Sequence, residues 1–140
     1  MNETKKLCVL FVCIGNACRS PMAEAILRQD AGDQIEAASA GLFPLGFVPE
    51  MTLETLKRNG YSTEGLRSKP IDNNLLSKMD LVLNLSGYDN NDVALRGAAR
   101  IEEWPVADPF GEDGAVYQKT LEEIQGRVRD LLARLQKERS

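Results

Sequence analysis

The feature that most constrains this chain is a continuous apolar run near its start, from Leu7 to Val12. The run is rich in residues that favour β-structure, and it stands between Lys6 and the pair Gly15-Asn16. A strand buried on both faces has this pattern, whereas a half-exposed strand would alternate apolar and polar residues. Such buried strands are typical of parallel sheets covered by helices on both sides. We therefore expect an α/β fold.

The rest of the chain alternates helix and strand patterns. Ser20 as N-cap and Pro21 as the first helical residue predict a helix that Gly32 ends. Further strands are predicted over 35–39, 80–85 and 100–104, and further helices over 50–58 and 73–78. A long helix is predicted near the end of the chain, because one face of it would carry the apolar residues Leu121, Ile124, Val128, Leu131, Leu132 and Leu135. This order predicts a single three-layer domain over residues 1–140, a four-stranded parallel sheet flanked by helices on both faces.

The charge balance and the cysteines limit the partners of this chain. It has 17 Lys and Arg against 21 Asp and Glu, a formal net charge of −4, so we expect no nucleic acid partner.

No apolar run approaches the ~18–20 residues that a membrane span needs. The three cysteines are an odd number and all lie in the first twenty residues, which is untypical of a disulfide scaffold. We expect a reducing, cytoplasmic compartment.

The chain contains no histidine. Its absence excludes nucleophiles activated by a histidine base and metal sites built on imidazole. We expect neither a metal nor a cofactor. A nucleophile in this chain therefore needs another source of activation.

The segment from Cys13 to Ser20 follows the first strand and reads as cysteine, five residues, arginine and serine. Backbone N–H groups of a loop that curls into a helix start bind anions. Gly15 allows a backbone conformation that other residues resist, and Arg19 can donate two N–H groups to phosphate oxygens. We expect a phosphate-binding loop formed by Ile14, Gly15, Asn16, Ala17, Cys18 and Arg19.

Cys13 is the candidate nucleophile, because it would lie under the bound anion. A helix N-terminus and a nearby cation favour the thiolate form of a cysteine without an imidazole base. Attack of this thiolate on phosphorus would give a cysteinyl-phosphate and a free alcohol or phenol. We interpret Cys8 as a small core residue and Trp104 as part of the core.

These motifs resemble the low-molecular-weight protein tyrosine phosphatases. The resemblance spans essentially the whole chain and rests on the strand Val9-Leu10-Phe11-Val12, the loop Cys13-Ile14-Gly15-Asn16-Ala17-Cys18-Arg19-Ser20, the continuation Pro21-Met22-Ala23-Glu24-Ala25, and the later motifs Ser39-Ala40-Gly41 and Asp108-Pro109-Phe110. The loop with its continuation is highly specific, whereas the Asp-Pro pair alone is weak.

The resemblance implies a role for each of five residues. Cys13 would be the nucleophile, Arg19 the clamp on the phosphate and transition state, and Asp108 the general acid. Ser20 would donate a hydrogen bond to the Cys13 sulfur, and Asn16 would brace the loop. Proton donation by Asp108 also has a physical rationale, because phenol has a pKa of about 10 and general acids contribute roughly 10²–10⁴-fold.

The resemblance also implies a substrate and partners. The substrate would be a phosphotyrosine protein or a small aryl phosphate, and Phe110 could pack on its ring at the mouth of the site. Bacterial relatives often act on tyrosine kinases, so a bacterial tyrosine kinase is a candidate partner. Cys18 lies close enough to Cys13 along the loop that oxidation would join them and protect the nucleophile.

Three departures from the family pattern leave alternatives open. Gly111 stands where the family often has a second aromatic residue, and the loop 42–49 fits the pattern poorly, with Leu45 or Phe47 as candidate wall residues. Thioredoxin-linked arsenate reductases share the fold but need two further cysteines, and residues 83–91 contain none. An arsenate reductase that uses an external small thiol therefore stays an alternative, and a phosphocysteine carrier is a weaker one.

Overall fold

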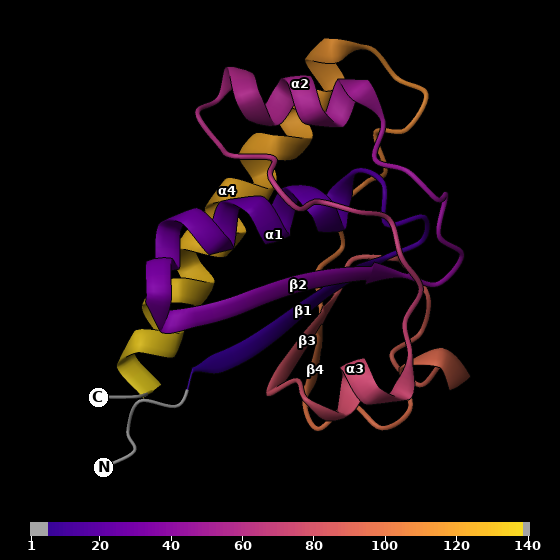
Figure 1. The fold of residues 1–140 in the computed structure, drawn as a ribbon, viewed down its shortest axis with the longest axis vertical. Coiled ribbons are helices and arrows are strands. Elements are labelled where there is room, and N and C mark those ends of the chain that lie inside the picture. Colours follow the sequence, from indigo (N-terminus) through magenta and orange to yellow (C-terminus); the bar gives the residue numbers. More distant parts are fainter. Residues whose placement is uncertain (1–5, 139–140) are drawn as a thin grey trace.

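The computed structural model describes residues 6–138, and a parallel sheet lies at its centre (Figure 1). The strands follow the order β2-β1-β3-β4, and each neighbouring pair is parallel. Their bounds are β1 Leu7–Cys13, β2 Ile35–Gly41, β3 Leu81–Asn84 and β4 Ile101–Glu103. The predicted strand at the start of the chain therefore lies inside the sheet, between β2 and β3.

Helices cover both faces of this sheet. Helices α1 (Arg19–Ala31), α2 (Glu50–Arg58) and α4 (Gly114–Glu138) lie on one side, and the short α3 (Asn73–Ser77) lies on the other (Figure 1). The predicted fold, a four-stranded parallel sheet between helical layers, is confirmed. Helix α4 spans 25 residues, yet one of its faces is charged. No helix within residues 6–138 is both long and apolar enough to cross a bilayer.

The apolar run of β1 packs into two cores because successive side chains point to opposite faces. Val9 and Phe11 join the core under α1 and α4, while Leu10 and Val12 join a smaller one on the α3 side. All four are fully buried. Cys8 is only half-buried and packs at the margin of the smaller core, whereas Trp104 is buried as expected.

The start of α1 differs from the prediction. The helix begins at Arg19, its N-cap position is Cys18, and no side chain caps it. Ser20 lies within the first turn, so its prediction as N-cap was wrong. Its hydroxyl contacts the Cys13 sulfur and accepts a hydrogen bond from Asn16 instead. Strand β2 also continues to Gly41, two residues past the predicted end.

The topology places the end of β1 at the point where ligands bind in sheets of this type. The chain passes from β1 to β2 on one side and then returns past β1 to β3 on the other side. The direction of the strand order therefore reverses at β1. Cys13 is the last residue of β1 and stands opposite Gly41 of β2. The loop after Cys13 therefore opens at the carboxyl edge of the sheet.

Gly41 is expected to tolerate no side chain, in contrast to Gly126 in α4. A Cβ atom at Gly41 would lie 2.9 Å from both the Cβ and the backbone nitrogen of Asn16, whereas one at Gly126 meets nothing within 4 Å. We expect Gly41→Ala to lower the free energy of unfolding by about 1–3 kcal/mol through overpacking. Gly126→Ala should raise it by roughly 0.5–1 kcal/mol, because alanine favours a helix interior. Urea unfolding measures both, and equal midpoints for the two variants would contradict the role of Gly41.

Candidate active site

The loop after β1 is held on one side by the segment that follows β2. Backbone N–H groups of Leu42, Phe43 and Leu45 donate to the carbonyl oxygens of residues 13, 14 and 15, at 3.1, 2.8 and 2.9 Å respectively. The segment 42–45 therefore runs alongside the loop and forms one wall of the hollow above it. Loop and wall are fixed to each other through backbone groups.

Asn16 fixes the loop from behind. Its φ of 50° lies in the left-handed region, which asparagine adopts more readily than most residues. Its Nδ2 donates to Ser20 Oγ at 2.8 Å and to Ser39 Oγ at 3.0 Å, and its Oδ1 accepts from the backbone N–H of Lys69 at 2.8 Å. One fully buried amide thus joins the loop to α1, β2 and the segment before α3.

The hydroxyl of Ser20 is directed at the nucleophile candidate. Ser20 Oγ lies 2.9 Å from Cys13 Sγ, and it also accepts a hydrogen bond from Asn16 Nδ2. A hydroxyl has a single proton to donate, and here the amide occupies an acceptor position of the oxygen. The proton is therefore available for a hydrogen bond to the sulfur.

A buried carboxylate continues this network. Ser39 Oγ donates to Glu24 Oε1 at 2.6 Å, and Glu24, which is only 4% exposed, forms an ion pair with Arg28 one turn along α1. Burial lowers the pKa of the Lys69 ammonium, while the charge of Glu24 opposes this shift. Two cations therefore balance the one buried carboxylate behind the loop.

Arg19 brings a buried positive charge to the opposite side of the loop. Its Nη1 donates to the carbonyl oxygens of Leu85 at 2.6 Å and Val106 at 3.0 Å, and its Nη2 lies 3.4 Å from Asp108 Oδ2. Within the described residues, Nε is buried without a hydrogen-bond partner. The guanidinium is thus held rigidly by two carbonyls and keeps donors for an anion.

Asp108 and Phe110 lie on the loop between β4 and α4. The backbone N–H of Phe110 donates to Asp108 Oδ1 at 3.1 Å, which fixes the carboxylate in a short turn. The Asp108 side chain is 44% exposed, so it stands at the boundary between the buried guanidinium and solvent. Gly111 follows with φ of 86°, a conformation in which an aromatic residue would be strained.

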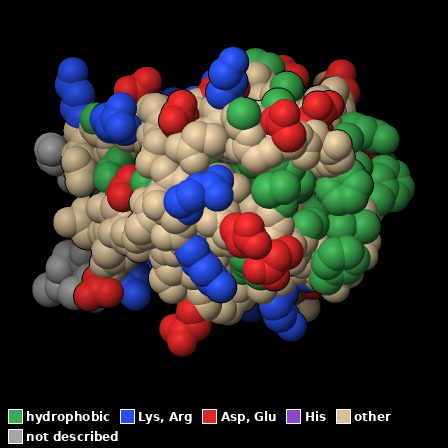
Figure 2. All heavy atoms as spheres, turned by 90° about the horizontal axis from the view of Figure 1, so that it is seen from above, with side chains coloured by type: hydrophobic (Ala, Val, Ile, Leu, Met, Phe, Trp, Pro, Cys, Tyr) green, Lys and Arg blue, Asp and Glu red, His purple; other side chains and the backbone are tan. Residues whose placement is uncertain are grey.

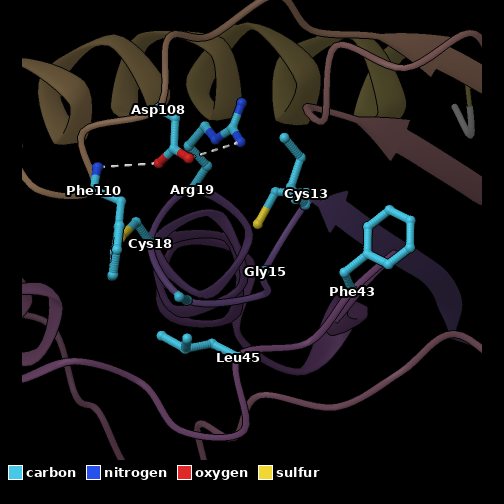
Figure 3. A pocket seen from close by; sticks show the side chains of 10 residues that line it. Cys13, Gly15, Cys18, Arg19, Phe43, Leu45, Asp108 and Phe110 are labelled. Carbon is cyan, nitrogen blue, oxygen red and sulfur yellow. Dashed lines mark hydrogen bonds and ion pairs between the residues drawn. The ribbon is translucent and has the colours of Figure 1, made fainter.

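These side chains surround one pocket of about 220 Å³. Figure 3 shows the Cys13 sulfur, the Arg19 guanidinium and the Asp108 carboxylate around it, with Phe43, Leu45 and Phe110 at its margins. Its lining consists of Cys13, Ile14, Gly15, Ala17, Cys18, Arg19, Phe43, Leu45, Asp108 and Phe110. In Figure 2, hydrophobic side chains gather at the end of the molecule toward which the strands point. The pocket thus combines a polar base with an apolar rim.

Cys18 lines the pocket but its thiol is engaged on the α4 side. Its Sγ lies 3.4 Å from the hydroxyl of Tyr117, and both groups are buried. Burial raises the pKa of the Cys18 thiol above its usual value, and hydrogen bonds from Thr52 and Tyr117 only partly offset this. Burial likewise raises the pKa of Tyr117. Cys18 is therefore held as a neutral thiol at neutral pH.

The structure brings most of the predicted site residues together. Asn16 and Ser20 are the exceptions, since they lie behind the loop and do not line the pocket. Of the two candidate wall residues, Leu45 lines this pocket and Phe47 lines a neighbouring hollow. The loop 42–49 does supply a wall of the pocket, but Phe43 was not among its candidate residues, because the sequence does not show which side chains of this loop face the pocket.

Comparisons with known proteins agree with this geometry. The family model for low molecular weight phosphotyrosine protein phosphatases matches residues 8–140. Arsenate reductase 2 of Staphylococcus haemolyticus is 33% identical over 130 residues, which cover 92% of this chain and 98% of that protein. The chain is thus similar to proteins named for two different activities.

Two solved structures share the fold. The low molecular weight protein tyrosine phosphatase from T. tengcongensis is 33% identical, with a TM-score of 0.82 and coverage of 92% of this chain and 99% of that one. A variant of the YwlE arginine phosphatase with a phosphorylated active-site serine is 27% identical, with a TM-score of 0.84 and coverage of 94% and 97%. The similarity extends over nearly the full length of each chain.

Proposed function

This chain belongs to the low molecular weight phosphotyrosine protein phosphatase family, and we propose that it hydrolyses phosphotyrosine or other aryl phosphates through a cysteinyl-phosphate. The observation that carries the proposal is the meeting of Cys13, Arg19 and Asp108 around one pocket with an apolar rim. We also propose that residues 1–140 act as one domain, since the family model matches residues 8–140.

In the first step, the Cys13 thiolate attacks phosphorus and the bond to the leaving oxygen breaks. The loop N–H groups and the free donors of Arg19 hold the three remaining oxygens, on which negative charge is spread. Asp108, in its protonated form, gives its proton to the leaving phenolate oxygen. The ion pair between Arg19 and Asp108, at 3.4 Å, must open as the phosphate takes the place of the carboxylate beside the guanidinium.

In the second step, water attacks the cysteinyl-phosphate. Asp108 now carries a negative charge and accepts a proton from the attacking water. The S–P bond breaks, and the Ser20 hydroxyl, 2.9 Å from Cys13 Sγ, stabilises the sulfur as it leaves. Inorganic phosphate is released, and the Cys13 thiolate and the protonated Asp108 are restored. The cycle therefore uses neither a metal nor a histidine.

The rim of the pocket supports an aromatic substrate. Phe43 and Phe110 are 63% and 54% exposed, which leaves their rings available to pack against a phenyl ring above the loop. We propose a phosphotyrosine protein as substrate, with a bacterial tyrosine kinase as a candidate partner. The odd number of cysteines, all within the first twenty residues, is untypical of a disulfide scaffold and supports a reducing, cytoplasmic location.

Arsenate reduction is the second candidate, and the similarity to arsenate reductase 2 of Staphylococcus haemolyticus favours it. Arsenate resembles phosphate in shape and charge, so the same loop would accept it. Residues 83–91 contain no cysteine, and the reduction would therefore require an external small thiol. Asp108 would have no leaving phenol to protonate in that reaction.

Phosphoarginine is an alternative substrate for the same hydrolysis, because the chain is also similar to the YwlE arginine phosphatase. The half-exposed carboxylate of Asp108 lies where a substrate guanidinium would approach. The uncharged rings of Phe43 and Phe110 favour an aryl group instead. A direct comparison of substrates separates the two.

The deciding experiment compares three reactions of the pure protein in the presence of a metal chelator. We expect hydrolysis of nitrophenyl phosphate, slower hydrolysis of free phosphoarginine, and no arsenate-dependent oxidation of a small thiol. Cys13→Ser should abolish turnover but still bind inorganic phosphate, since the loop and Arg19 remain. Thiol oxidation without any hydrolysis would replace the phosphatase proposal with the reductase.

Asp108→Asn should slow poor leaving groups selectively, because an amide cannot supply the proton. We expect kcat/KM, which reports the first step alone, to fall by roughly 10²–10³-fold for phenyl phosphate and much less for an activated nitrophenyl ester. Asp113→Asn is the matched control on the same loop, since Asp113 binds the N–H of Val116 at the start of α4 and asparagine serves there too. An equal fall of kcat/KM for both esters would remove Asp108 from the role of acid.

We further propose that Cys18 protects Cys13 during oxidation. Peroxide would convert the Cys13 thiolate to a sulfenic acid, and the Cys18 sulfur would then displace water from it to form a disulfide. Cys18 must first leave its contact with Tyr117, and burial keeps it protonated until then. The Cys18 thiol therefore becomes available for the disulfide only after its contact with Tyr117 has opened.

After peroxide treatment and reduction with a dithiol, the wild type should recover most of its activity. The Cys18→Ala variant should recover little, because its sulfenic acid is oxidised further. Cys8→Ala, which alters a half-buried thiol on β1, serves as the control and should behave like the wild type. Irreversible loss of wild-type activity under the same treatment argues against protection.

A further inference from the structure

A second hollow adjoins the pocket and has no part in the chemistry described so far. Its volume is about 440 Å³, twice that of the pocket. It lies between the loop after β2, the start of α2 and the segment before α3. Its lining includes Phe47, Val48, Leu53, Leu66, Arg67 and Ser68.

The two hollows share a wall. Leu45 lines the pocket, and Gly46 and Phe47 line the second hollow. Ser68 fixes this wall to the phosphate-binding loop, because its Oγ donates to the carbonyl of Gly15 at 3.0 Å and accepts from the N–H of Gly46 at 3.0 Å. A ligand that spans the wall would therefore contact both hollows without any movement of the chain.

The chemistry of the second hollow is apolar with one charge at its margin. Val48, Leu53 and Leu66 are half-buried and offer hydrocarbon surface. Arg67 is exposed, and its guanidinium has no carboxylate partner within residues 6–138. An apolar side chain with an acidic residue beside it matches both features.

The separation of the two hollows suits a peptide. Residues two apart in a chain have Cα atoms at most about 7 Å apart. The Cα atoms of Leu45 and Phe47, which face the two hollows, are therefore no farther apart than this. A substrate strand advances by about 3.3 Å per residue. A residue two or three positions from the phosphorylated one would therefore reach the second hollow.

We propose that the second hollow is a specificity subsite for a protein substrate. It binds an apolar side chain two or three residues from the phosphotyrosine, and Arg67 pairs with an acidic residue next to that side chain. The assignment rests on the proposed phosphatase function. It adds a preference for the residues around the phosphotyrosine. Hydrolysis of free aryl phosphates does not report this preference, because they carry no neighbouring residues.

The test uses short phosphotyrosine peptides and nitrophenyl phosphate side by side. At each position within three residues of the phosphotyrosine, peptides carry leucine or alanine, with glutamate or lysine next to it. For the wild type we expect kcat/KM to be about tenfold higher with leucine than with alanine at one such position. Glutamate should exceed lysine there by roughly threefold.

Two variants outside the pocket separate the contributions. Leu53→Gln should lower the ratio for leucine over alanine to near one, and Arg67→Glu should reverse the preference for glutamate over lysine. Both should leave kcat/KM for nitrophenyl phosphate unchanged. Val93→Gln and Arg129→Glu are the matched controls, since both residues are exposed and neither lines the pocket or the second hollow. The controls should preserve the wild-type ratios.

Each other result overturns the inference. Equal kcat/KM for all peptides, or variant effects that appear equally with nitrophenyl phosphate, would show that the second hollow does not select substrates. A change in the sedimentation of Leu53→Gln or Arg67→Glu with unchanged peptide ratios would make this surface a contact between copies of the chain. Failure of the wild type on nitrophenyl phosphate itself would remove the proposed function, and the subsite with it.

Discussion

The geometry of the site depends on one buried amide, the side chain of Asn16. Its three hydrogen bonds join the phosphate-binding loop to α1, β2 and the segment before α3. The left-handed backbone at Asn16 is sustained by these bonds, and Gly41 leaves room for it, because a side chain there would press on Asn16. Ser20 is oriented toward Cys13 only because the same amide donates to it. The curvature of the loop and the environment of the nucleophile thus have a common origin.

The charges of the site are local and buried, whereas the chain as a whole is mildly acidic. Arg19 is 4% exposed on the pocket side, and Glu24 is equally buried behind the loop. A buried charge is costly unless it is paired and hydrogen-bonded, and both groups meet that condition. One buried guanidinium therefore gives the pocket a local positive charge. The absence of histidine is consistent with this design, since the proton is assigned to a carboxyl group.

Local patterns in the sequence were sufficient for much of this structure and failed where distant segments meet. The run Leu7–Val12 could be interpreted as a buried strand because burial on both faces removes alternation. The cysteine-containing loop after it could be recognised because its residues follow one another directly in the sequence. Ser20 was wrongly predicted as an N-cap because it stands directly before an apolar helix, where N-cap residues are common. In the structure its hydroxyl instead contacts the sulfur of Cys13, seven residues earlier. Phe43 and the second hollow were not foreseen, because both depend on contacts of the loop 42–49 with distant residues, Tyr88 beside Phe43 and Ser68 beside Gly46.

The two carbonyl groups that hold Arg19 have a consequence for the order in which the site forms during synthesis. Leu85 and Val106 are 66 and 87 residues further along the chain, and Tyr117 of α4 contacts Cys18 from 99 residues away. Cys18 and Arg19 leave the ribosome early, but the residues that contact them leave it much later. In a nascent chain, Arg19 therefore lacks its carbonyl partners until Val106 has been made, and Cys18 lacks its contact until Tyr117 of α4 has been made. The surroundings of this pocket are therefore complete only after the whole fold has formed.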